Sequence, residues 1–424
     1  MSKTILLIDM WIHTRHNEKA GIYISGIERV CNEELTYALE SGNFDIYLIS
    51  SRRKEEFLTV LQKNVPELQQ CKVLYMPKTA WWGKLLRFPL SVFSRLIQKS
   101  DWGCRYILSR CLPLITSSWT WGTKKLSNLP ELKGKKVIYY SCFRSFHPSV
   151  MKDKNILKAA TIHDIIPLRY FKFENCEYYG YLADFYILSK YSDFLFWVSK
   201  FTKDDFMDFF PKTKASGIVN YCAADSSFHP HNENEISSIR KKYNIPEGKK
   251  YILSVAASAK RKNIDLLIQC FLKMLSMYQV DDIQMVLVGS FYAEDNNLKR
   301  LIDCNSHVIT MTGFVEEADL PVLYSGASCY CFLSDYEGFG LPLIEAFQTG
   351  CPVICSNLTC LPEIAGNAAI EVSTTDENVI AQTIWEICNN KNLSADLKTK
   401  GAIRAKDFSW EKHGENFVTS LENL

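Results

Sequence analysis

Short apolar, β-rich runs alternate with longer stretches of helical periodicity along this chain, and this alternation restricts the possible folds more than any other feature. Apolar runs of this length, separated by amphipathic helices, are typical of parallel sheets that are covered by helices on both faces. Because 424 residues are too many for one hydrophobic core, two series of such runs predict two doubly wound α/β domains. The expected strands are residues 4–9, 44–50, 135–141, 158–164 and 193–199 in the first series, and 250–256, 283–289, 307–313, 329–334 and 351–356 in the second.

A polar and charged stretch at residues 231–250 separates the two series and has the composition of an interdomain linker. The preceding segment, residues 220–230, contains the predicted boundary. We therefore expect an N-terminal domain over residues 1–222 and a C-terminal domain that begins at residue 223.

Composition excludes several classes of protein. The formal net charge is +2, which gives no general attraction for nucleic acid. No run reaches 18 apolar residues, and the first run, Ile5–Ile8, is too short for a signal peptide, so neither a membrane span nor a leader is expected. The 15 cysteines are scattered, and many lie in apolar runs. This pattern predicts reduced, buried thiols in a cytoplasmic protein and no metal site.

Residues 81–126 form a separate segment that is rich in tryptophan, lysine and arginine and contains the single acid Asp101. Tryptophan favours the membrane interface and basic groups attract anionic lipid headgroups, so this basic insertion is a candidate for peripheral contact with an anionic membrane surface. The alternative is an insertion that packs on its own domain and exposes a solvated basic face.

The strongest chemical signal spans residues 335–345, where Glu337 and Glu345 flank a glycine-rich loop and the start of a helix. Gly338 and Gly340 allow backbone N–H groups to approach a ligand closely, and a helix N-terminus favours anions. Such a loop suits a sugar diphosphate, with the glutamates accepting hydrogen bonds from hydroxyl groups. The alternative is an ordinary strand–loop–helix connection with a capping acid.

A second signal is the basic cluster at residues 260–263, directly after the predicted strand at 250–256. Basic side chains at the start of a helix are unfavourable unless an anion accompanies them. Arg261 and Lys262 would bind a diphosphate by charge-assisted hydrogen bonds. The alternative is a solvated basic turn.

Two weaker signals lie in the N-terminal half. His163 follows a predicted strand and precedes Asp164, and an imidazole whose tautomer is fixed by an acid can donate to a sugar hydroxyl. Gly26 begins a predicted helix after the first strand, where a backbone N–H could approach a phosphate. Each pattern is common and is weak evidence by itself.

Taken together, these motifs resemble the family-four group of retaining glycosyltransferases with the GT-B fold, in which two Rossmann-like domains face each other across a cleft. The resemblance covers most of the chain and is most specific over residues 311–357. Residues 251–265 resemble the subgroup in which an R-K-N sequence binds the donor phosphates. The resemblance also implies a C-terminal nucleotide-sugar domain over residues 223–405 and a last helix, residues 406–424, that crosses back to the acceptor-binding N-terminal domain.

The family resemblance implies a role for each matching residue. Glu337 would contact the hydroxyl groups of the donor sugar, and Glu345 would bind the nucleotide ribose. Arg261 and Lys262 would neutralise the leaving diphosphate, and His163 would contact the sugar. Backbone groups at the remaining positions would bind the donor, namely Gly26, Gly338, Phe339, Gly340 and Leu341.

The expected activity is therefore metal-independent, retaining hexosyl transfer, mannosyl or related, from a nucleotide-sugar donor to a glycan or lipid-linked acceptor. No cofactor is expected. The resemblance favours surface polysaccharide biosynthesis at the cytoplasmic face of the membrane. Two alternatives stay open: a non-catalytic sugar-nucleotide-binding scaffold and a sugar-nucleotide epimerase of the same architecture.

Overall fold

The structure is a computed structural model that describes residues 3–9, 26–50, 71–75, 116–117, 120, 123–170, 176–255, 259–289 and 296–424. The chain divides into two compact units, each built on one parallel sheet. The first unit contains Met1–Tyr221 together with Glu411–Leu424, and the second contains Cys222–Trp410.

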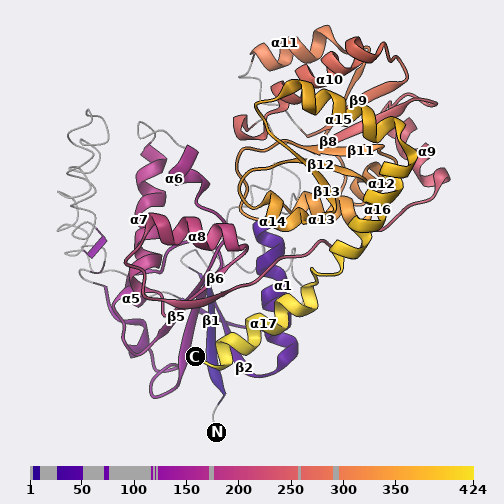
Figure 1. Cartoon of the computed structure of the whole chain (residues 1–424). Helices are drawn as coiled ribbons and strands as arrows, with labels where there is room; N and C mark the ends of the chain where they lie inside the picture. The colour runs from indigo at the N-terminus through magenta and orange to yellow at the C-terminus, as the bar shows by residue number, and fades with distance from the viewer. Residues whose placement is uncertain are drawn as a thin grey trace, which may run out of the picture. The chain divides into compact units, whose positions relative to one another are not determined.

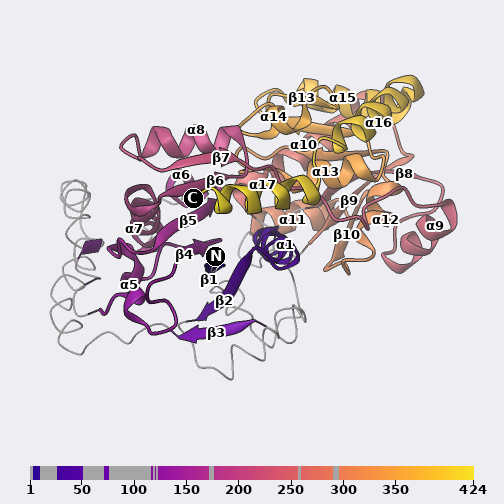
Figure 2. The same ribbon diagram turned by 90° about the horizontal axis from the view of Figure 1, so that it is seen from below.

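The first unit contains a seven-stranded sheet in the order β3-β2-β1-β4-β5-β6-β7, whose paired strands run parallel (Figure 2). Its strands are β1 (Thr4–Asp9), β2 (Phe44–Ser50), β3 (Lys72–Tyr75), β4 (Val137–Ser141), β5 (Leu157–Ile162), β6 (Phe194–Trp197) and β7 (Ser216–Val219). Its helices are α1 (Gly26–Ser41), α5 (Pro148–Met151), α6 (Ile166–Tyr170), α7 (Cys176–Tyr191), α8 (Lys200–Phe209) and α17 (Trp410–Glu422).

The second unit contains a six-stranded parallel sheet in the order β10-β9-β8-β11-β12-β13. Its strands are β8 (Lys250–Val255), β9 (Ile283–Val288), β10 (Ile309–Gly313), β11 (Cys329–Phe332), β12 (Val353–Ser356) and β13 (Ala369–Val372). Its helices are α9 (Glu233–Lys242), α10 (Ile264–Tyr278), α11 (Asn296–Cys304), α12 (Leu320–Ser325), α13 (Leu341–Gln348), α14 (Leu361–Ala365), α15 (Glu377–Asn389) and α16 (Lys391–Ala405). Both doubly wound sheets agree with the predicted fold class, and every strand expected from the sequence is present.

The last helix of the chain, α17, belongs to the core of the first unit (Figure 1). Phe417 of α17 is fully buried, and its ring centroid lies 4.8 Å from that of Tyr140 in β4 and 5.2 Å from that of Phe196 in β6. Val418 and Leu421 extend the same apolar cluster toward α1 and the strands of the sheet. The first sheet is therefore covered in part by residues that are more than 190 positions away in sequence from its last strand.

Gly414 allows α17 to approach α1 closely. A Cβ atom at Gly414 would lie 2.0 Å from Cγ of Tyr37, which is far inside van der Waals contact. We therefore expect Gly414→Ala to lower the free energy of unfolding by about 1–3 kcal/mol, the usual cost of overpacking. Chemical denaturation would measure this. The control is Gly180→Ala in α7, where no atom lies within 4 Å of the added carbon and removal of a helical glycine should be neutral or stabilising. Equal effects of the two substitutions would contradict the prediction.

The predicted reduced state of the cysteines is wrong for one pair. Cys31 of α1 and Cys142, directly after β4, form a disulfide. The sequence did not reveal this pair because 111 positions separate the two residues, and only the packing of α1 on the sheet brings them together. Ten further cysteines whose side chains the structure describes are free thiols, and most of them are buried.

The basic insertion at residues 81–126 lies largely outside the described residues, which include only 116–117, 120 and 123–126 of it. Within the described part of the chain, no helix is long and apolar enough to cross a membrane.

Candidate active site

The sequence motifs of the second unit meet where the strand order of its sheet reverses. β8 is the first strand of this sheet in sequence, and its neighbours are β9 on one side and β11 on the other. Ligands of open α/β sheets bind outside the carboxyl ends of the strands at such a switch point. The basic cluster follows β8, and the glycine-rich loop follows β11, so this edge of the sheet is the candidate active site.

Asn263 fixes the basic cluster against the neighbouring loop. Residues Lys260–Lys262 form one turn of 3-10 helix, and Asn263 then adopts a left-handed conformation with φ 51° before α10 begins. Its Nδ2 donates to the carbonyl oxygen of Leu333 at 2.9 Å and to Oδ1 of Asp335 at 2.6 Å. The backbone N–H of Asp335 donates in turn to the carbonyl oxygen of Arg261 at 2.7 Å. These bonds hold the two loops in a fixed relation.

The side chains of Arg261, Lys262 and Glu337 form one charged cluster. Nη1 of Arg261 lies 2.5 Å from Oε1 of Glu337 and also donates to the carbonyl oxygen of Tyr336 at 2.8 Å. Nζ of Lys262 lies 4.0 Å from the same carboxylate oxygen, which also accepts a hydrogen bond from Oγ of Ser334 at 2.9 Å. All three charged side chains are at most 20% exposed. One carboxylate therefore faces two cations in a partly buried site.

Burial and neighbouring charges act in opposite directions on the pKa of Lys262. Burial lowers the pKa of its ammonium group, and Arg261 lowers it further, whereas the carboxylates of Glu337 and Glu345 raise it. Because burial dominates, the charged form is disfavoured here. An anion placed beside Lys262 would restore the pKa and would gain a charge-assisted hydrogen bond.

The glycine-rich loop requires Gly340 at the start of α13. Gly340 has φ 92°, and a Cβ atom there would lie 2.9 Å from Cδ2 of Leu361. The loop enters α13 at Leu341, so the first backbone N–H groups of an eight-residue helix end beside the charged cluster. Gly338 and Phe339 are buried in this loop, and the Phe339 ring packs against Phe408 with ring centroids 5.8 Å apart. The predicted donor-binding backbone therefore forms a rigid, close-packed turn.

Glu345 lies one turn into α13 and is only 6% exposed. Its Oε2 accepts a hydrogen bond from the hydroxyl group of Tyr324 at 3.1 Å. Burial raises the pKa of Tyr324 well above its ordinary value, so this hydroxyl remains a donor. The structure thus gathers Arg261, Lys262, Glu337 and Glu345 in one unit.

His163 belongs to the first unit and follows β5. Its Nε2 lies 2.7 Å from the carbonyl oxygen of Cys142 and donates to it, so this carbonyl fixes the tautomer. Burial lowers the pKa of His163, which keeps the imidazole neutral at pH 7. Oδ1 of Asp164, the acid that we predicted to orient His163, accepts the backbone N–H of Ile166 at 2.8 Å. Gly26 is the first residue of α1, as predicted.

Sequence reasoning missed a buried polar network beside His163. The carboxylate of Glu34, in α1, is 1% exposed and accepts hydrogen bonds from the hydroxyl groups of Tyr140 and Thr161. Nε2 of His413, in α17, lies 3.5 Å from Oε1 of the same glutamate. The electrostatic interaction with Glu34 raises the pKa of His163 and partly offsets the effect of burial. Glu34 and His413 resemble ordinary surface residues of amphipathic helices in the sequence, so the pattern gives no sign of the network.

No group of three or more His, Cys, Asp or Glu side chains in the described part of the chain could hold a metal ion.

Comparison with solved structures identifies the architecture. HepE from Anabaena, solved in complex with UDP and glucose, matches this chain with a TM-score of 0.63 and 13% sequence identity over the full length of both chains. WaaG, a glycosyltransferase involved in lipopolysaccharide biosynthesis, matches with a TM-score of 0.63 and 12% identity over 98% of this chain and 99% of that one. Two Rossmann-like parallel sheets with these neighbours define a protein of the GT-B fold.

Sequence comparison adds the family. Residues 235–404 match the family described as Glycosyl transferases group 1. O-antigen chain mannosyltransferase B of Escherichia coli is 31% identical over 217 residues, which cover 50% of this chain and 56% of that protein. The chain spans about half the length of this curated relative. The residues of the charged cluster lie within the segment that matches this family.

Proposed function

We propose that this chain is a retaining glycosyltransferase that moves a hexosyl residue, with mannosyl as the first candidate, from a nucleotide sugar to a glycan or lipid-linked glycan. The observation that carries the proposal is the cluster of Arg261, Lys262 and Glu337 at the switch point of the second sheet. Two cations and a carboxylate fit a substrate that carries both phosphates and hydroxyl groups. The similarity of the chain to O-antigen chain mannosyltransferase B supports a mannosyl donor and a role in surface polysaccharide biosynthesis.

In the proposed reaction, the bond between the anomeric carbon and the diphosphate oxygen breaks, and negative charge develops on the leaving diphosphate. Arg261 and Lys262 stabilise this charge in a partly buried environment, where electrostatic interactions are stronger than in water. The acceptor oxygen bonds to the anomeric carbon on the face that the diphosphate leaves. Its proton passes to the departing phosphate oxygen, so atoms and charge balance and the configuration is retained.

Glu337 has two roles in this proposal. It accepts hydrogen bonds from the donor sugar, and it orients Arg261 through their ion pair. Glu345 binds the ribose diol from α13. Gly26 and His163 keep the roles that the resemblance implies, as a donor of a backbone N–H to phosphate and as a sugar contact.

A sugar-nucleotide panel tests the donor. We expect one of GDP-mannose, the UDP-hexoses and dTDP-rhamnose to raise the melting temperature, because a ligand that binds only the native state stabilises it. That donor, incubated with candidate acceptors, should yield a glycosylated product with the anomeric configuration of the donor. Stabilisation without turnover on any acceptor would favour the scaffold, and an altered sugar nucleotide without acceptor would favour the epimerase. Failure of every sugar nucleotide to bind would end the proposal.

The proposed setting is the cytoplasmic face of the membrane, with the basic insertion at residues 81–126 in contact with anionic lipids. The tryptophan and basic side chains of that insertion support the proposed contact with lipids. We expect the purified protein to float with anionic vesicles, and a variant that lacks residues 81–115 to float less. Equal flotation of the two proteins would assign membrane contact to another surface, and absence of both from the vesicles would exclude it.

A further inference from the structure

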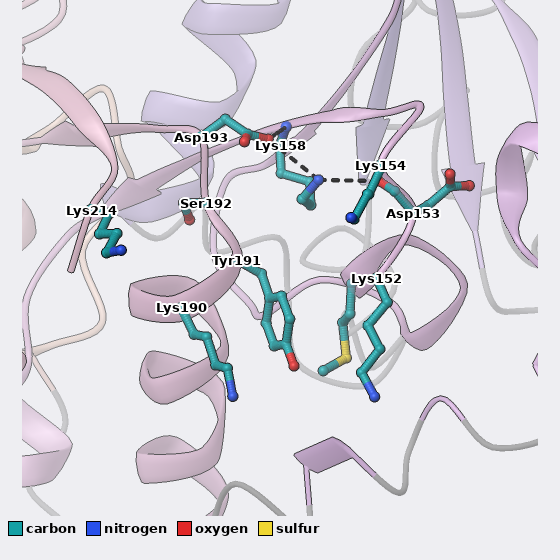
Figure 3. Close-up of a pocket in the computed structure, with 10 residues that line it drawn as sticks. Lys152, Asp153, Lys154, Lys158, Lys190, Tyr191, Ser192, Asp193 and Lys214 are labelled. Carbon is teal, nitrogen blue, oxygen red and sulfur yellow. Dashed lines mark hydrogen bonds and ion pairs between the residues drawn. The ribbon is translucent and has the colours of Figure 1, made fainter. Parts of the chain in front are cut away.

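A basic cavity of about 580 Å³ opens in the first unit, away from the residues discussed so far (Figure 3). Its walls are the loop after α5, the start of β5, the end of α7 with the loop that follows it, and Lys214 before β7. It therefore lies at the amino-terminal ends of β5, β6 and β7. His163 follows the opposite end of β5, and a six-residue strand spans about 20 Å. We call this cavity the lysine pocket, after the five lysines that line it: Lys152, Lys154, Lys158, Lys190 and Lys214.

The two acids of the lysine pocket are already engaged. Both carboxylate oxygens of Asp153 accept hydrogen bonds from Ser127, one from its backbone N–H and one from its hydroxyl, each at 2.9 Å. Asp193 accepts the backbone N–H of Lys158 at 2.8 Å, and its carboxylate lies 3.3 Å from the Nζ of the same lysine. These acids hold the loops together, and only the buried Lys158 is neutralised by either of them.

The other four lysines have no carboxylate partner among the described residues. Lys152 donates to Oγ of Ser117 at 2.7 Å, and Lys190 donates to the hydroxyl group of Tyr186 at 3.2 Å. This hydrogen bond raises the pKa of Lys190, which therefore stays charged. Lys154 and Lys214 form no ion pair or hydrogen bond with any residue that the structure describes.

Figure 3 shows that the side chains of Lys152, Lys190 and Tyr191 extend in the same direction from their backbones. Their two ammonium groups and one hydroxyl group therefore end on the same side of the pocket. Four like charges around one cavity repel each other, and the repulsion is relieved when an anion binds between them.

We propose that the lysine pocket binds a phosphate-bearing anion. A phosphate group carries up to two charges and three acceptor oxygens, so it can satisfy several ammonium groups at once. The cavity has room for more than one phosphate group. Such a ligand is either a soluble phosphate compound or the headgroup of a phospholipid, and the two share the same chemistry at the pocket. This site is distinct from the donor-binding cluster and does not depend on the proposed glycosyl transfer.

Inorganic pyrophosphate is the first probe, and calorimetry at low ionic strength is the measurement. Because pyrophosphate would also bind at Arg261 and Lys262, the protein carries Lys262→Ala throughout. We expect this protein to bind pyrophosphate, and the further double substitution Lys154→Gln/Lys214→Gln to weaken binding about tenfold or more, since each charge-assisted hydrogen bond contributes strongly. Neither of the two lysines has a partner in the described structure, so the fold should persist; circular dichroism would verify this.

The matched control is Lys133→Gln/Lys135→Gln, which removes the same charge from two exposed lysines of the same unit outside the pocket. Pyrophosphate affinity should fall clearly less in this control than in Lys154→Gln/Lys214→Gln, because the two control lysines do not line the pocket. If both double variants lost the same amount of pyrophosphate affinity, the proposal would be overturned. The loss would then follow from the lower net charge of the protein and not from the pocket. Absence of any pyrophosphate binding, together with absence of vesicle binding, would also overturn it.

Vesicle flotation distinguishes the two sources of phosphate. The vesicles are phosphatidylcholine with and without phosphatidic acid, which exposes a phosphate monoester. Flotation that requires phosphatidic acid, and that pyrophosphate and Lys154→Gln/Lys214→Gln both reduce, identifies a lipid headgroup. Binding of pyrophosphate without flotation identifies a soluble phosphate compound. Flotation that the double variant leaves unchanged assigns the lipid contact to another surface, and it counts against the lysine pocket as a headgroup site.

Discussion

Lys262→Ala will lower kcat/KM for sugar transfer by about 10²–10³-fold, the usual effect of removing one preorganised group that stabilises developing charge. The melting temperature without ligand should change little. Burial already lowers the pKa of this ammonium group, so its charge is not a source of stability in the folded state. Steady-state kinetics with the donor identified from the panel, together with a melting curve, would measure both quantities.

Lys260→Ala is the matched control for this prediction. Lys260 belongs to the same 3-10 turn, but it is exposed and has no partner among the described residues. We expect kcat/KM to stay within about twofold for Lys260→Ala, as for most surface substitutions. If both variants lost kcat/KM equally, the loss would reflect the total positive charge of the turn. The specific role of Lys262 would then be rejected.

Glu34→Ala will lower the free energy of unfolding of the first unit by about 3–5 kcal/mol, because three buried side chains lose the carboxylate with which they all interact. The carboxylate of Glu34 is the acceptor for Tyr140 and Thr161, and it lies 3.5 Å from Nε2 of His413. None of these groups can reach water easily. Chemical denaturation, followed by circular dichroism, would measure the loss.

The control is Glu40→Ala, six residues further along the same helix, where the side chain is exposed. Its effect should lie within about 0.5 kcal/mol of zero, as for other surface positions. A second variant, Glu34→Gln, keeps one acceptor oxygen and should lose less stability than Glu34→Ala. A loss below about 1 kcal/mol for Glu34→Ala would mean that the network adds no more than a surface interaction.

The fold could be predicted because the central strands are buried on both faces. β8, β9 and β11 are almost entirely buried, so each appears in the sequence as a continuous apolar run. The three strands that we did not predict, β3, β7 and β13, lie at sheet edges and are short. β7, for example, has no buried residue. A half-exposed edge strand lacks the apolar signal that identifies the interior ones.

The candidate site was only partly predictable, for a different reason. Arg261, Lys262 and Glu337 follow predicted strands, and parallel topology places the carboxyl ends of neighbouring strands at one edge. That reasoning predicts that these side chains lie close together, but it does not predict which of them interact directly. It therefore missed the ion pair of Arg261 with Glu337. It also missed the network of Glu34 and His413, because 379 positions separate these residues. An amphipathic helix pattern assigns both to the solvent face.

The position of α17 has a consequence for the order of folding during synthesis. Domains usually fold in the order in which they leave the ribosome. Here Phe417 and Leu421 belong to the core of the first unit, so this unit cannot complete its core until residues 417–421 have been synthesised. The second unit, Cys222–Trp410, is synthesised in full before then. In a released chain that is truncated after Trp410, the second sheet should therefore be protected from proteolysis while the first stays susceptible.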